Sequence, residues 1–255
     1  MTLEIRQFPC RTDNYGILVR DTASGQVALI DAPDEDAILE AITDTGWTPN
    51  MILTTHHHGD HVEANLPLKE KFGLTITGPA AEAEKIPGID VKVGDGDVIR
   101  LGSQSIRVIA TPGHTAGHVV YHFVDAGVLF AADTLFALGC GRLFERSAAE
   151  MHHALSRLAA LPDATIVYCG HEYTAANAKF AVTIDPDNPA LAKRVTEIDA
   201  LRAAGKPTLP TTIGLEKATS PFLRWADPSI RRHLGMVDAS DAEVFAEIRK
   251  RKDNF

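Results

Sequence analysis

The chain has 255 residues, of which 45% are hydrophobic, and its 34 acidic and 25 basic residues give a formal net charge of −9. This length and apolar content predict one large core with a smaller appendage. The acidic balance excludes nonspecific binding to nucleic acid or anionic membranes, because both need a basic surface. No apolar stretch approaches the roughly 20 residues that span a bilayer, and the opening MTLEIRQFPC contains no signal core. We therefore expect a cytoplasmic protein with no membrane partner.

Short apolar runs broken by Gly, Pro and Asp dominate the first 170 residues and predict β-strands. The strands are expected at 15–19, 26–31, 51–55, 74–78, 105–113, 118–124, 127–133 and 165–170, with helices at 35–44 and 62–72. Beyond about residue 175 strands nearly vanish, and helices are expected at 189–204 and after a capping box of Ser240 and Glu243. We predict a metal-binding catalytic domain over residues 1–175 and a helical domain over 176–255.

The most distinctive segment is HHHGDH at residues 56–61, directly after the expected strand at 51–55. In extended backbone, His56 and His58 point to the same side. Gly59 permits a tight turn, so Asp60 and His61 form a second pair of donors. Imidazole and carboxylate are ligands of divalent metals, and a surface histidine run with incidental metal affinity is the alternative interpretation.

Three further candidate ligands stand where other predicted strands end: His114, Asp133 and His171. Neighbouring strands lie about 4.8 Å apart, so residues at several strand ends converge on one cavity. A single zinc ion takes about four ligands, so the full set predicts two divalent ions. One ion would take His56, His58 and His114, the other Asp60, His61 and His171, and Asp133 would bridge them. A helix cap is the alternative role for Asp133.

Other residues near these motifs are expected to be structural. Asp31 closes a strand before Ala-Pro and is expected to build a turn, with the orientation of a metal ligand as the alternative role. His118 is expected to lead a strand, with support of a metal ligand as the alternative. Cys140 and Cys169 are expected to be small packing residues. The three cysteines show no CxxC spacing, so no disulfide frame or cysteine metal site is indicated.

The motifs THHHGDH, TPGHTAGH, ADTLF and CGHEYT, in this order, resemble the metallo-β-lactamase superfamily. Within it, DTLFALGCGRLFE, YCGHEYT, SPFLR and RKRKD resemble the glyoxalase II family, the hydroxyacylglutathione hydrolases, over nearly the whole chain. The resemblance implies an α/β (α+β) fold, a four-layer αββα sandwich with a smaller C-terminal helical domain that helps hold glutathione. It implies hydrolysis of S-D-lactoylglutathione to D-lactate and glutathione.

The resemblance also implies roles for single residues. It places the seven candidate ligands as described and has Asp60 and Asp133 position the bridging hydroxide. Glutathione would be held by Arg142, Tyr173, Arg249 and Lys252, and Phe144 stands where some relatives have a tyrosine whose hydroxyl meets the glutathione. For Arg249 and Lys252, a solvated helix end is the alternative, because the helix dipole alone favours cations there.

The chemistry fits a thioester. A metal lowers the pKa of bound water to about 7 and polarises a carbonyl, and a thiolate leaves without a strong general acid. We expect two divalent ions per chain, zinc with iron or manganese as the other candidates, in a monomer that acts on a small glutathione thioester. The alternatives are another enzyme of the superfamily (a mononuclear iron persulfide dioxygenase, a lactonase or a β-lactamase) and a non-catalytic metal-holding or electron-transfer module.

Overall fold

The computed structural model describes residues 3–255 and divides into two compact units. The first unit runs to Thr111 and resumes over Thr115–Phe130; the second comprises Pro112–His114 and Ala131–Phe255. Among the described residues, no helix combines the length and the apolar character that crossing a membrane would need. The predicted mixture of strands in the first part of the chain and helices after it is confirmed.

The first unit contains a six-stranded sheet whose strands follow chain order. They are β1 (Leu3–Cys10), β2 (Asn14–Asp21), β3 (Val27–Ile30), β4 (Met51–Leu53), β5 (Thr75–Pro79) and β6 (Val91–Val93). β1, β2 and β3 pair antiparallel, and β3 to β6 pair parallel. All four residues of β3 are buried, because a parallel strand in a covered sheet is apolar on both faces.

Helices cover one face of this sheet: α1 (Glu35–Thr45), α2 (Gly59–Val62) and α3 (Asn65–Phe72). Ile38 of α1 and Leu68 of α3 share one apolar core with Leu29 of β3 and Ile52 of β4. Burying side chains of this size contributes about 1.5–3 kcal/mol each. The hydrophobic effect therefore holds the helices to the strands that precede the histidine motif.

The helix expected over 62–72 is confirmed over residues 65–72 as α3, but its predicted start is wrong, because Val62 ends α2 and residues 63–64 separate the two helices. At the break, the Ala64 amide donates to the carbonyl oxygen of Ala32, at 3.0 Å. This bond ties the chain to the end of β3, which a helical pattern in the sequence does not reveal. The 3-10 helix η1 (Ala80–Lys85) connects β5 to β6.

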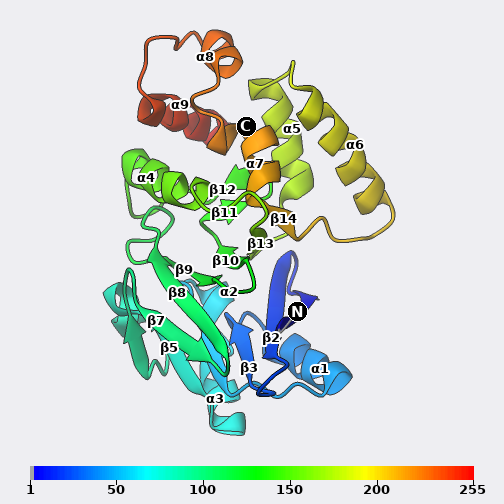
Figure 1. The fold of residues 1–255 in the computed structure, drawn as a ribbon, viewed down its shortest axis with the longest axis vertical. Helices are drawn as coiled ribbons and strands as arrows, with labels where there is room; N and C mark the ends of the chain where they lie inside the picture. Colours follow the sequence, from blue (N-terminus) through cyan, green and yellow to red (C-terminus); the bar gives the residue numbers. More distant parts are fainter. Residues whose placement is uncertain (1–2) are drawn as a thin grey trace. The chain divides into compact units, whose positions relative to one another are not determined.

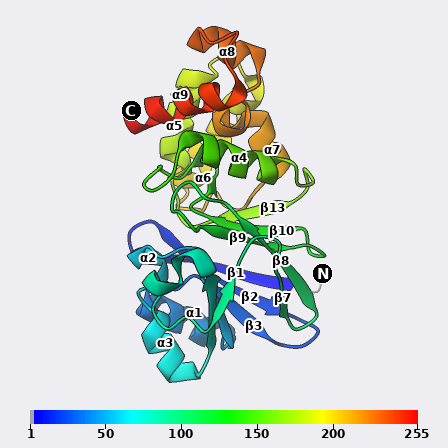
Figure 2. The same ribbon diagram turned by 90° about the vertical axis from the view of Figure 1, so that its left-hand side faces the viewer.

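The other face of the sheet is covered by antiparallel strands of the same unit. They are β7 (Val98–Leu101), β8 (Gln104–Ala110), β9 (Val119–Phe123) and the first part of β10 (Val128–Ala132). Tyr121 of β9 donates its hydroxyl to the carbonyl oxygen of Thr54, just after β4, at 2.7 Å. Figure 2 shows α1, α2 and α3 on one side of β1–β3, and β7 and β8 on the other.

The second unit is mostly helical. Its helices are α4 (Ala148–Ala159), α5 (Thr174–Ile184), α6 (Pro189–Ala203), α7 (Ile213–Thr219), η2 (Pro221–Leu223), α8 (Pro228–Leu234) and α9 (Asp241–Asp253). Its short strands are β11 (Leu135–Phe136), β12 (Gly139–Cys140), β13 (Ile166–Cys169) and β14 (Thr211–Thr212). α5 lies beside α6, and α4 packs against α9 (Figure 1). The helix predicted at 189–204 is confirmed as α6, and the capping box of Ser240 and Glu243 is confirmed at the start of α9.

Asp21, at the end of β2, is buried and accepts hydrogen bonds from the amide and hydroxyl of Ser103, each at 2.8 Å, and from the Ser24 hydroxyl at 2.6 Å. Burial alone would raise the pKa of Asp21, but these hydrogen bonds outweigh it and hold the pKa well below its usual range. A carboxyl with a lowered folded pKa stabilises the protein above its unfolded pKa, near 3.9, and this contribution falls as the pH drops further.

We therefore expect Asp21→Asn to lower the free energy of unfolding at pH 7 by about 1–3 kcal/mol, because buried donors lose their acceptor. The difference from the wild type should shrink between about pH 4 and pH 3, where the carboxyl of the unfolded chain becomes protonated. Urea unfolding over this pH range measures it, with the exposed Asp125→Asn as the control. If the variant's free energy of unfolding were lower by the same amount at every pH, the lowered pKa of Asp21 would not contribute to stability.

Candidate metal centre

The histidine motif lies in the first unit, between the end of β4 and the start of α2. His56 is buried, and its Nε2 lies 3.1 Å from Nδ1 of His58. His57 points elsewhere, and its Nδ1 lies 2.8 Å from Oε2 of Glu82 in η1. On the first turn of α2, Nε2 of His61 lies 3.7 Å from Oδ2 of Asp60. The extended backbone followed by a turn thus forms two pairs of donor atoms, His56 with His58 and Asp60 with His61, and the rings of His56 and His61 lie 4.1 Å apart between their centroids.

A second group of donors lies in the second unit. Asp133 follows β10, and His171 follows β13. Oδ2 of Asp133 lies 3.4 Å from Nε2 of His114, and Oδ1 lies 3.5 Å from Nε2 of His171. All three residues are buried. Each carboxylate oxygen of Asp133 therefore faces a different imidazole, as a carboxylate that bridges two metal ions requires.

These distances suit a bound metal ion. Ligand atoms at about 2.0–2.1 Å from a tetrahedral zinc ion lie roughly 3.3 Å from one another. The four donor pairs, two in each unit, are separated by 3.1, 3.7, 3.4 and 3.5 Å. Nitrogen and carboxylate oxygen donors at this spacing have the composition and the geometry of a divalent metal site.

Asp31 fixes the tautomers of two of these histidines. A carboxylate only accepts, so Nδ1–H of His61 donates to Asp31 Oδ2, at 2.8 Å. The Thr55 hydroxyl also donates to Oδ2, at 2.8 Å, and its oxygen lies 3.0 Å from Nδ1 of His56, from which it can accept. Both imidazoles are then left with Nε2 as the nitrogen that can bind a metal.

The expectation that Asp31 only builds a turn is therefore incomplete. Asp31 also has a backbone φ of 55°, in the left-handed region, and is 4% exposed. The signal in the sequence was its position at the end of β3, the strand that pairs with β4 ahead of the histidine motif. Its partner residues lie 24 and 30 positions away, so the sequence pattern alone did not reveal them.

In the second unit, backbone and aromatic groups orient the imidazoles. Nδ1–H of His114 donates to the carbonyl oxygen of Arg142 at 2.9 Å, which leaves Nε2 facing Asp133. The ring of Tyr173 stacks on the ring of His171 with centroids 4.7 Å apart and planes 2° from parallel. Phe144 is 62% exposed, and its ring centroid lies 5.2 Å from that of His114.

The predicted glutathione contacts differ in how accessible they are. Arg142 is exposed and Lys252 is half-buried. Burial, followed by the charges of Arg249 and Arg142, lowers the pKa of Lys252, so the three cations lie close enough to repel one another. Arg249, however, is 4% exposed, and its guanidinium donates to the carbonyl oxygen of Cys140 at 2.9 Å and pairs with Asp253. Arg249 thus holds α9 to β12, whatever further role it has.

The other residues singled out in the sequence, Cys140, Cys169 and His118, are buried. Burial raises the pKa of the Cys169 thiol to about 12, and it raises the pKa of Cys140 as well, so neither supplies a thiolate near neutral pH. His118 is buried, and its ring stacks on that of His56 with centroids 4.7 Å apart. It packs against a candidate ligand, and its omission from the ligand set stays a prediction.

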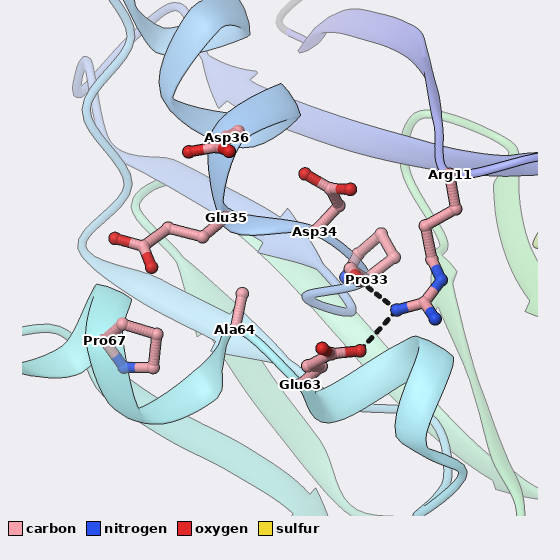
Figure 3. Close-up of a pocket in the computed structure, with 8 residues that line it drawn as sticks. All are labelled: Arg11, Pro33, Asp34, Glu35, Asp36, Glu63, Ala64 and Pro67. Atoms are coloured by element: carbon pink, nitrogen blue, oxygen red, sulfur yellow. Dashed lines mark hydrogen bonds and ion pairs between the residues drawn. The ribbon is translucent and has the colours of Figure 1, made fainter.

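A cavity of about 360 Å³ lies in the first unit beside the start of α1 (Figure 3). Its lining is Arg11, Pro33, Asp34, Glu35, Asp36, Glu63, Ala64 and Pro67. Arg11 donates to the Pro33 carbonyl oxygen at 3.1 Å and pairs with Glu63. The four carboxylates of this cavity would repel an anionic ligand, so it does not suit glutathione.

Two family models match adjoining parts of the chain. The model of the metallo-beta-lactamase superfamily matches residues 14–171, and the model of the hydroxyacylglutathione hydrolase C-terminus matches residues 172–255. The two matches meet close to the domain boundary predicted at residue 175, which itself stays a prediction.

Curated relatives match over their full length. A hydroxyacylglutathione hydrolase from Mesorhizobium japonicum is 67% identical over 255 residues and covers 100% of both chains. One from a Chelativorans species is 64% identical over the same length and coverage. One from Brucella ovis is 60% identical over 253 residues, which is 99% of this chain and 98% of that protein.

Solved structures share the fold at lower identity. ETHE1 from Myxococcus xanthus is 27% identical, with a TM-score of 0.70 over 97% of this chain and 90% of that one. The protein TTHA1623 in a di-iron-bound form is 26% identical, with a TM-score of 0.64 over 86% of this chain and 100% of that one. The fold expected from the sequence, a metallo-β-lactamase fold followed by a helical C-terminal region, is confirmed by these matches. The chain therefore belongs to the metallo-β-lactamase superfamily and, within it, to the hydroxyacylglutathione hydrolase family.

Proposed function

We propose that the protein hydrolyses S-D-lactoylglutathione, and related 2-hydroxyacyl glutathione thioesters, to the free 2-hydroxy acid and glutathione. Two divalent ions would activate the water and the thioester. The ligands are His56, His58 and His114 for one ion, Asp60, His61 and His171 for the other, and Asp133 for both. The observation that carries the proposal is the placement of the two Asp133 oxygens at 3.4 and 3.5 Å from two different imidazoles.

When bound, the two ions lower the pKa of water to make a nucleophile near neutral pH and polarise the thioester carbonyl. Asp60 and Asp133 hold the attacking water in position by their carboxylates. Asp31 and the carbonyl oxygen of Arg142 keep His61 and His114 in the tautomers that present Nε2. The glutathione thiolate departs without a dedicated acid, because a thiol has a pKa near 8.5.

Zinc is the ion we propose, because three imidazoles and carboxylates in tetrahedral spacing suit it. Iron and manganese accept the same donors, so the ions in the cell depend partly on supply. The monomeric state and the cytoplasmic location expected from the sequence stay predictions.

The anionic part of glutathione needs a basic surface in this acidic protein. Arg142 and Lys252 supply accessible cations whose charges act on each other. Arg249 adds positive charge while its guanidinium is bonded to Cys140 and Asp253. Tyr173 and Phe144 flank His171 and His114 and form the aromatic part of the proposed binding surface. Phe144 has no hydroxyl to donate, so its contribution to binding is apolar.

The alternatives fit less well. A mononuclear iron dioxygenase needs few ligands and open positions for dioxygen, whereas seven candidate donors are present here. The named curated relatives that match over the full length are hydroxyacylglutathione hydrolases, at 60–67% identity. A non-catalytic metal-binding role is tested directly by turnover of the thioester.

Removal of the metal tests the centre. We expect a chelator to abolish hydrolysis of S-D-lactoylglutathione, and zinc to restore it with two ions bound per chain, as counted by elemental analysis. Asp133→Ala should lose metal and lower kcat/KM by more than about 100-fold. Loss of a residue that only supports a metal ligand costs up to about 100-fold, so loss of a ligand itself should cost more. Full activity in metal-free protein would refute the proposal.

A single cation tests the glutathione contacts. We expect Lys252→Ala to raise KM by about 10–100-fold with a smaller change in kcat, because a charge-assisted hydrogen bond to substrate contributes about 1.5–3 kcal/mol. Lys250→Ala, an exposed cation on the same helix, is the control and should leave both constants unchanged. Equal KM values for the two variants would place glutathione elsewhere.

A further inference from the structure

Glu82 is a buried carboxylate that is not among the seven candidate ligands of the metal centre. It lies in η1, is 3% exposed, and accepts three hydrogen bonds from other parts of the first unit. Oε2 accepts from the backbone amide of His57 at 3.0 Å and from its Nδ1–H at 2.8 Å. Oε1 accepts from the backbone amide of Gly117 at 2.6 Å.

The donors belong to two different loops that carry candidate ligands. His57 stands between His56 and His58, whose facing nitrogens are 3.1 Å apart. Gly117 ends the loop that carries His114 along the chain, and that loop is closed by the Thr111 amide, which donates to the His118 carbonyl oxygen at 2.8 Å. One carboxylate therefore joins the backbones of two ligand loops, and each of its oxygens serves one loop.

The approach of η1 to the second loop depends on the glycine. A Cβ atom at Gly117 would lie 2.7 Å from Cγ of Glu82 and 2.8 Å from Cβ of Ala81, closer than such atoms come in proteins. Only a residue without a side chain leaves room for the 2.6 Å hydrogen bond. The hydrogen bond from Gly117 to Glu82 therefore requires a glycine at this position.

We propose that Glu82 is a positioning residue for the metal centre, which it serves by fixing the backbones of His57 and Gly117. The inference rests on the proposed function for the identity of the ligands. It also assigns a role to the middle histidine of HHH, whose Nδ1 meets Glu82. An ionised carboxylate has only acceptors, so it suits three donors at once, whereas an amide does not.

The test compares Glu82→Gln with Glu84→Gln, an exposed glutamate in the same short helix. In metal-free protein, we expect Glu82→Gln to reduce the protection of the His57 and Gly117 amides from hydrogen exchange by at least about 10-fold, because the carboxylate oxygens no longer accept both. Zinc affinity, measured by competition with a coloured chelator, should fall by about 10–100-fold. Glu84→Gln should match the wild type in both measurements.

Gly117→Ala provides a second perturbation that leaves the carboxylate intact. Like Glu82→Gln, it should lower the zinc affinity and reduce the protection of the amide at position 117 from hydrogen exchange. If Glu82→Gln does not fold, these two measurements on Gly117→Ala test the proposal. In hydrolysis of S-D-lactoylglutathione, Glu82→Gln should lower kcat more than it changes KM, because the proposed substrate contacts are unchanged.

A purely structural role has a different signature. It would lower the thermal stability of metal-free Glu82→Gln while its zinc affinity stayed at the wild-type value, and that result would overturn the inference. If the wild type binds two zinc ions but does not cleave the thioester, the proposed function is wrong. The measurements of zinc affinity and amide exchange still test the role of Glu82 in that case.

Discussion

A neutral imidazole can bind a metal only through the nitrogen that carries no proton, so every histidine ligand needs an acceptor for its other N–H. The rest of the proposed centre depends on this constraint. Asp31 accepts a hydrogen bond from Nδ1–H of His61 directly and is linked to His56 through Thr55, and the carbonyl oxygen of Arg142 accepts one from Nδ1–H of His114. These acceptors are buried or belong to the backbone, so the tautomers are set by the folded chain.

The fold supplies these acceptors because of where its strands end. β3 and β4 pair in parallel, so Asp31 after one strand and Thr55 after the other leave the sheet at the same edge. Both strands are held by the apolar core beneath α1 and α3. Catalytic groups placed after buried strands are rigid, because the strands on which they stand cannot shift without opening that core.

Local patterns in the sequence predicted the pairing of donors in the histidine motif and the start of the last helix. The alternation in HHHGDH directs Nδ1 of His57 to Glu82, and the capping box at Ser240 marks the start of α9. What the sequence did not reveal depends on contacts between distant residues. The break between α2 and α3 follows from the bond of Ala64 to Ala32, and the role of Asp31 follows from partners 24 and 30 positions away. The burial of Arg249 likewise depends on Cys140, 109 positions earlier.

The left-handed backbone of Asp31, with φ at 55°, limits what evolution can place at this position. Glycine, asparagine and aspartate tolerate such a conformation, whereas branched or bulky side chains do not. Glycine would abolish the acceptor, and asparagine would present two fewer lone-pair sites to the three donors that converge there. Steric and chemical demands thus select the same amino acid independently, which leaves almost no neutral substitution open at residue 31.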